Sequence, residues 1–199
     1  MKAKRSPVSS KLPLVLDFDG VVCDSLKESL LVVWNGAGDN LPVEFSVQGL
    51  RALPPDFVER FTRYRPYARH LGHFLVPLLQ ELPLMRTQEA FEAAYQSLDR
   101  ARKECFIQAV SQYRQQVRET HPVTWLKMQR CYRGIIPYLS RREGPIYIVT
   151  ARDQMSVLQL LESKGLILAP EQVLGEQSPK LAALATIAER EQVPHGPDR

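Results

Sequence analysis

The 199-residue sequence contains no run of about eighteen apolar residues, so it has no segment suited to crossing a membrane. It also lacks the apolar core of a signal peptide, because the basic stretch MKAKRSPVSS is followed only by LPLVL. Cysteine is scarce. Cys23, Cys105 and Cys131 stand at irregular spacing, which argues against a disulfide framework and suits a reducing compartment. We therefore expect a cytoplasmic protein whose residues 1–11 form a frayed arm.

No strong excess of one charge is present, although the charge is unevenly distributed along the chain. The net charge is +4, and residues 51–133 hold fourteen Lys or Arg against eight Asp or Glu, a balance of +6 that leaves about −2 elsewhere. A basic middle segment suits an anionic small molecule or nucleic acid, and equally a solvated surface. The 44% hydrophobic content suffices for a core, in one domain with a large insertion or in two small domains.

Short apolar runs rich in branched residues predict the buried strands of a parallel sheet. They lie at residues 13–18, 144–150 and 172–174. Helices are predicted at about residues 25–34, 134–142, 153–164 and 179–191. Asp24 or Ser25 can cap the first of these helices, Gly165 can close the third, and Pro179 stands near the start of the last.

The middle of the chain has a different pattern. Phe57, Phe61 and Tyr64 recur at helical spacing, and so does a second series that starts at Phe91 and runs toward Val117 without proline or glycine. Breaks are expected near residues 82–83 and 121–122. The fold class is therefore expected to be α/β, a Rossmann-like doubly wound parallel sheet with an inserted all-helical cap. The core would span residues 1–30 and 134–199, and the cap residues 31–133.

Polar side chains follow the predicted strands where each one ends. Asp17 and Asp19 follow the first strand, Thr150 and Arg152 follow the second, and Lys180 opens a later helix. Ligands of an open parallel sheet gather at the carboxyl ends of its strands, so we expect these groups to converge. Adjacent carboxylates resist joint ionisation unless a cation such as Mg²⁺ offsets their charge.

Such a pair can divide the work of phosphoryl transfer. One carboxylate can attack phosphorus, while its neighbour donates a proton to the leaving oxygen and later takes one from water. Gly20 removes side-chain bulk beside an incoming phosphate and permits an unusual backbone turn.

These residues carry a resemblance to a known family. DFDGVVCDS resembles motif I of the haloacid dehalogenase (HAD) superfamily in its phosphatase form, IVTAR resembles motif II, and the lysine of SPKLAAL resembles that of motif III. The helical insertion is placed like the C1-type cap of phosphoglycolate phosphatases and β-phosphoglucomutases. The resemblance covers the core well, and the cap only in its placement and helical character.

The resemblance also implies roles for the residues that match the motifs. Asp17 would be the nucleophile, and Asp19 the general acid and base. Asp17 and Asp19 would hold Mg²⁺, the latter through its backbone carbonyl. Thr150 would bind a phosphoryl oxygen and Lys180 would neutralise charge. Arg152 has no general role in the family, and it is assigned to substrate or phosphate contact along with Gly20, or to a surface ion pair.

One part of the family pattern is missing, namely motif IV, an acidic pair after a further apolar strand. The sequence ends at VPHGPDR, where Asp198 precedes any such strand. Either the chain is truncated before motif IV, which we expect, or it lacks the full metal site.

The expected activity is Mg²⁺-dependent hydrolysis of a small phosphorylated metabolite through an aspartyl-phosphate, with no membrane partner and with nucleic acid not expected. A phosphomutase of the β-phosphoglucomutase type, or a non-catalytic binding module on a HAD-like core, remains an alternative. His70 and His73 could share a helix face as metal ligands, but we favour ordinary residues of the cap.

Overall fold

A computed structural model describes residues 12–38, 40–79 and 83–192 of the chain. The protein is a mixed α/β structure with a small parallel sheet, and its chain divides into two compact units. Unit 1 joins the described residues up to Val22 with those from Cys131 onward, and unit 2 comprises the described residues of Cys23–Arg130. In the described part of the chain, no helix has the length and apolar character needed to cross a membrane.

Unit 1 is built on a three-stranded parallel sheet. Its strands are β1 (Leu14–Leu16), β4 (Ile146–Val149) and β5 (Val173–Leu174), in the order β1-β4-β5. Leu16 is paired with Ile148, and Val149 with Leu174. All four residues of β4 are buried, as expected for a central strand with apolar residues on both faces. The three residues of β1, an edge strand of this sheet, are only partly buried.

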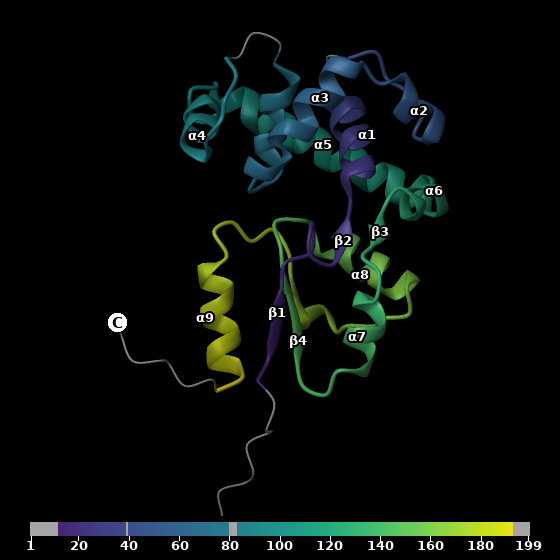
Figure 1. Ribbon diagram of the computed structural model, residues 1–199, viewed down its shortest axis with the longest axis vertical. Helices are drawn as coiled ribbons and strands as arrows, with labels where there is room; N and C mark the ends of the chain where they lie inside the picture. Colours follow the sequence, from purple (N-terminus) through teal and green to yellow (C-terminus); the bar gives the residue numbers. More distant parts are fainter. Residues whose placement is uncertain (1–11, 39, 80–82, 193–199) are drawn as a thin grey trace, which may run out of the picture. The chain divides into compact units, whose positions relative to one another are not determined.

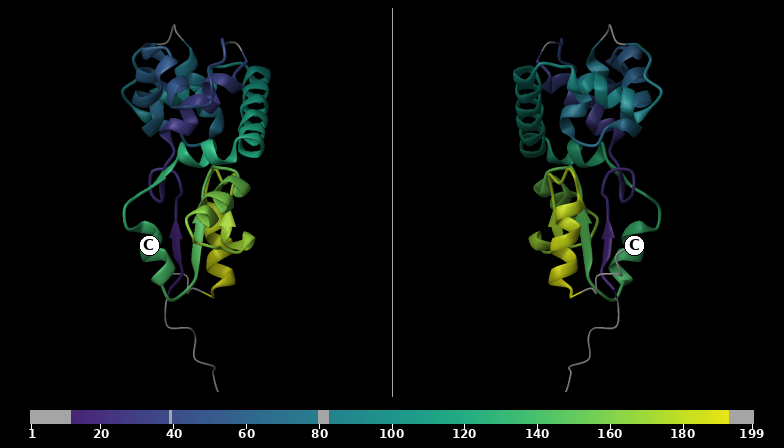
Figure 2. Two further views of the ribbon diagram at one scale, coloured as in Figure 1. Left: turned by 90° about the vertical axis from the view of Figure 1, so that its right-hand side faces the viewer. Right: turned by 90° about the vertical axis from the view of Figure 1, so that its left-hand side faces the viewer.

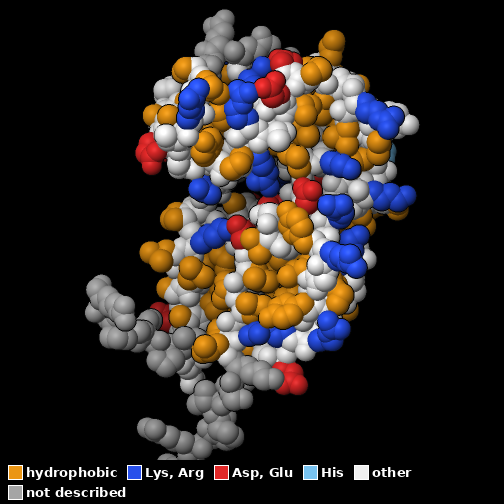
Figure 3. Space-filling view, viewed as in Figure 1, with side chains coloured by type: hydrophobic (Ala, Val, Ile, Leu, Met, Phe, Trp, Pro, Cys, Tyr) orange, Lys and Arg blue, Asp and Glu red, His pale blue; other side chains and the backbone are white. Residues whose placement is uncertain are grey.

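Helices cover both faces of this sheet. Helix α9 (Leu181–Arg190) packs Ala183 and Ile187 against Tyr147 and Val149 of β4, and Figure 1 shows α8 (Gln154–Ser163) on the opposite side. Helix α7 (Ile135–Arg141) and the 3₁₀ turn η3 (Pro170–Gln172) complete the unit, which Figure 2 shows from two further sides. Figure 3 shows hydrophobic side chains gathered on the face of unit 1 that carries β1 and α9.

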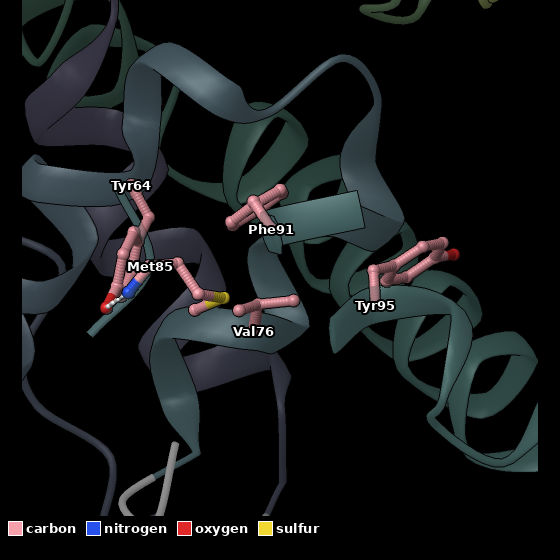
Figure 4. Close-up of a cluster of buried hydrophobic side chains, with 5 residues drawn as sticks. All are labelled: Tyr64, Val76, Met85, Phe91 and Tyr95. Atoms are coloured by element: carbon pink, nitrogen blue, oxygen red, sulfur yellow. Dashed lines mark hydrogen bonds between the residues drawn. The ribbon is translucent and has the colours of Figure 1, made fainter. Parts of the chain in front are cut away.

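Unit 2 is helical over nearly all of its described length. Its elements are β2 (Cys23–Asp24), α1 (Leu26–Gly36), α2 (Val47–Ala52), α3 (Pro55–Tyr64), η1 (Arg65–Tyr67), η2 (Leu71–Leu78), α4 (Gln88–Gln96), α5 (Arg100–Thr120) and α6 (Pro122–Lys127). Strand β2 pairs with β3 (Arg130–Cys131) in a separate two-stranded sheet. One hydrophobic cluster, drawn in Figure 4, contains Tyr64, Val76, Met85, Phe91 and Tyr95.

A buried ion pair lies inside unit 2. Arg114 Nε of α5 donates to Glu28 Oε1 of α1 at 2.8 Å, and Trp125 Nε1 of α6 donates to the same oxygen at 3.3 Å. Glu28 is fully buried and Arg114 is 7% exposed. Since two buried charges must be paired to be tolerated, this contact ties the packing of three helices to one geometry.

The strands and helices predicted for unit 1 are confirmed within a few residues of their ends. Asp153 caps α8 by accepting from the Ser156 N–H at 2.9 Å, and Gly165 has the left-handed φ of 80° that closes a helix. The break at residues 121–122 is also confirmed, since α5 ends at Thr120 and α6 begins at Pro122. The break expected near residues 82–83 falls largely outside the described residues.

Two expectations for the helical segment need correction. The series from Phe91 to Val117 is not continuous, because α4 ends at Gln96 and Asp99 starts a new helix by accepting from the Arg102 N–H at 2.9 Å. The unit boundaries also differ from the expected 30/31 and 133/134. Helix α1 lies wholly in unit 2, because its buried face packs on α5, and the chain changes unit after Val22 and after Arg130.

Candidate active site

The carboxyl ends of the strands in unit 1 bring the expected polar groups to one edge of the sheet. Because β1, β4 and β5 are parallel, the loops after Leu16, Val149 and Leu174 leave the sheet on the same side. These loops carry Asp17 and Asp19, then Thr150 and Arg152, and then the segment that leads to Lys180 at the N-cap of α9.

Two ion pairs join these loops. Lys180 Nζ lies 2.5 Å from Asp17 Oδ2, and Arg152 Nε lies 3.3 Å from Asp19 Oδ2. The first pair is open, with side chains 34% and 40% exposed for Lys180 and Asp17. The second is covered on one side, since Arg152 is 2% exposed and Asp19 is 23% exposed. The two acids predicted from the sequence are thus each matched with one of the two predicted cations.

Backbone hydrogen bonds hold the loop after β4 in place. Thr150 Oγ1 accepts from the Arg152 N–H at 3.2 Å, the Thr150 carbonyl accepts from the Gln177 N–H at 2.8 Å, and the Arg152 carbonyl accepts from the Glu176 N–H at 2.9 Å. Thr150 is 1% exposed, so its hydroxyl shapes this loop in the structure. Its predicted role as a phosphoryl ligand remains a prediction.

Two glycines serve different needs here. Gly20 has φ +82°, a left-handed conformation that glycine adopts readily, and a Cβ added to it would meet nothing within 4 Å. Of the two reasons given for Gly20, the structure therefore bears out the unusual turn. Gly175 is needed for close approach, because an added Cβ would lie 2.5 Å from Gln154 N and 2.8 Å from Arg152 O.

The side chains of the site limit how a metal ion could be bound. In residues 12–38, 40–79 and 83–192, no group of three or more His, Cys, Asp or Glu side chains is arranged to hold one, and this includes His70 and His73. Mg²⁺ is commonly bound by one or two carboxylates together with water and substrate phosphate. Asp17 and Asp19 fit an ion bound in that way, and they do not make a cage formed by protein ligands alone. Asp198, which precedes any strand of the kind that motif IV follows, lies outside the described residues.

Sequence reasoning missed two contributors to this edge of the sheet. Phe18, fully buried between the two aspartates, has its ring centroid 5.9 Å from Arg152 Cζ. Gly175 lets the loop after β5 approach the loop after β4. The glycine directly after the apolar VL pair was a signal for close approach, whereas no local signal linked Phe18 to a residue so far along the chain.

In comparisons with known proteins, no family model, no curated protein and no solved structure matches the chain.

Proposed function

We propose that the protein is a Mg²⁺-dependent phosphomonoester hydrolase of the HAD type, acting on a small phosphorylated metabolite through an aspartyl-phosphate. In this proposal unit 1 is a Rossmann-like doubly wound core and unit 2 is its inserted helical cap. The observation that carries the proposal is the pairing of Asp17 with Lys180 at 2.5 Å at the carboxyl end of the sheet, with Asp19 two residues after the nucleophile.

The proposed reaction has two steps. In the first, a carboxylate oxygen of Asp17 bonds to phosphorus, and the bond from phosphorus to the leaving oxygen breaks. That oxygen keeps the electron pair and takes a proton from the carboxylic acid of Asp19. In the second step, water bonds to phosphorus, the bond to Asp17 breaks, and the proton of the water returns to the Asp19 carboxylate. Phosphate and the free alcohol are the products.

The cations of the site suit this chemistry. Lys180 already offsets the charge of Asp17, so an approaching phosphate dianion meets a neutral pair in place of a bare carboxylate. Asp17 and the backbone carbonyl of Asp19 are the groups that would hold Mg²⁺. When bound, that ion would supply further positive charge to the phosphoryl oxygens.

The test is hydrolysis of 4-nitrophenyl phosphate with Mg²⁺ by the wild-type chain and by Asp17→Asn, which keeps the shape of the side chain and removes the nucleophile. We expect turnover to fall at least about 1,000-fold, to the uncatalysed background. Asp56→Asn is the matched control, because Asp56 lies on α3 in an exposed pair with Arg60 and should leave the rate unchanged. Undiminished turnover in Asp17→Asn would reject the proposal.

A binding module on the same core is a second candidate, favoured by one observation. Each acid already has its own cation, and among the described residues no group of three or more His, Cys, Asp or Glu side chains is arranged to hold a metal. In that case the wild-type chain would bind inorganic phosphate in a calorimetric titration and would hydrolyse neither aryl nor alkyl phosphates. A phosphomutase would return an isomer from a hexose phosphate, without release of phosphate.

A further inference from the structure

Arg152 is held more firmly than any other charged group of the candidate site. Its side chain is 2% exposed, its guanidinium lies against the ring of the fully buried Phe18, and both its backbone N–H and its carbonyl are hydrogen-bonded. A buried guanidinium needs an anionic partner, because its desolvation is otherwise not offset. Asp19 supplies a carboxylate at 3.3 Å.

The ion pair between Lys180 and Asp17 is more exposed than the pair between Arg152 and Asp19. Lys180 and Asp17 are each at least a third exposed, and the lysine side chain is long and flexible. Such a pair can open and exchange partners with an incoming phosphate, while the Arg152 guanidinium cannot leave its place without breaking its contact with Phe18. Arg152 is therefore built as a fixed support, and Asp19 is the more exposed member that reaches toward the reacting groups.

We infer that Arg152 is a positioning residue that orients the Asp19 carboxylate for proton transfer and does not itself bind the phosphoryl group. This inference rests on the proposed function. In the first step the Arg152 Nε–H can still donate to Oδ2 of the protonated Asp19, which keeps the acid where its proton can reach the leaving oxygen. In the second step Arg152 keeps the carboxylate where it can take the proton of the attacking water.

The leaving group separates this role from phosphate binding. An alkoxide needs a proton as it departs, whereas 4-nitrophenolate is stable enough to leave without one. Loss of a residue that orients the acid therefore slows the cleavage of alkyl phosphates most. Loss of a phosphate ligand raises KM for alkyl and aryl substrates alike, and a general loss of structure lowers both rates by the same factor.

The experiment compares wild type, Arg152→Gln and the control Arg190→Gln on 4-nitrophenyl phosphate and on the alkyl phosphomonoester that wild type hydrolyses fastest. Arg190 is an exposed arginine of α9 that donates to the Glu171 carbonyl. In Arg152→Gln, kcat/KM for the alkyl substrate should fall about 100-fold. For the aryl substrate kcat/KM should fall less than about 5-fold, and a burst of nitrophenolate should precede slow turnover, because the second step also needs Asp19. Arg190→Gln should match wild type.

Equal losses on both substrates, or a change confined to KM, would overturn the inference. Should Arg152→Gln fail to fold, Arg152→Lys answers the same question, since it keeps the charge but moves it off the carboxylate, and the same difference between substrates is expected. Failure of the proposed function looks different. In that case wild type is inactive on both substrates, or Asp17→Asn stays active, and both proposals fall. If wild type is active and Asp17→Asn is not, the Arg152 result bears on this inference alone.

Discussion

Acidification should destabilise unit 2 through one buried histidine. His73 is 2% exposed, its Nδ1 accepts from the Arg69 N–H at 3.0 Å, and its Nε2 lies 3.3 Å from Glu92 Oε2. The rings of His70 and Tyr95 have their centroids 3.8 Å and 4.5 Å away. Burial, and then the neighbouring His70, lower the pKa of His73 from 6.5 to about 4, although Glu92 acts in the opposite direction.

The sign and size of the effect follow from this pKa. Between pH 6.5 and about 4 the unfolded chain binds a proton at His73 and the folded chain does not, so stability is lost as the pH falls through that window. Above pH 6.5 the full stabilisation from neutral His73 is present, and below about pH 4 no more of it is lost. At 1.36 kcal/mol for each pKa unit, the total is about 3 kcal/mol. The pKa of His70 is lowered as well, chiefly by burial, and acts with the same sign.

Tryptophan fluorescence isolates this effect, because Trp34 and Trp125, the two tryptophans of the chain, both lie in unit 2. Urea unfolding would be followed at several pH values from 7.5 to 4 in wild type and in His73→Asn, whose side chain keeps an acceptor for the Arg69 N–H. His121→Asn is the control, since His121 is exposed at the start of α6. The wild type should lose about 3 kcal/mol more than His73→Asn between pH 6.5 and 4.

The reasoning is refuted if the free energies of unfolding of wild type and His73→Asn change in parallel with pH. It is also refuted if His121→Asn alters the pH dependence of this free energy as much as His73→Asn does. Comparison of variants cancels the carboxylates that titrate in the same range, since these are common to all three proteins.

Two further changes in unit 2 test its packing by the same urea titration. Phe91→Ala removes a fully buried ring from the cluster in Figure 4 and should lower the free energy of unfolding by about 3–5 kcal/mol. The control Val123→Ala, at a site 63% exposed, should lower it by less than about 0.5 kcal/mol. Similar urea midpoints for the two variants would contradict the assigned core. Glu28→Gln leaves Arg114 buried without its anion and should lower the free energy of unfolding by about 3 kcal/mol. A loss below about 1 kcal/mol would mean that the packing of Arg114 and Trp125 does not depend on the charge of Glu28.

Much of the fold was predictable from patterns that span only a few residues. The run IYIV predicted the buried central strand β4, and Asp153 and Gly165 marked the ends of α8. The same local reasoning failed between α4 and α5, because a chain without proline or glycine reads as continuous until an N-cap such as Asp99 is recognised. The position of α1 was also missed, since its partner α5 is distant in the sequence.

For the candidate site, the sequence by itself determined which polar groups follow each strand, because a strand and the loop after it are set by neighbouring residues. It also determined the order Asp17, Thr150, Lys180 on which the resemblance to a phosphatase family depends. Only the tertiary structure decided how these groups pair. Arg152 and Asp19 stand 133 positions apart, and their contact exists because the parallel strands place two loops at one edge of the sheet, where a buried guanidinium must find a carboxylate.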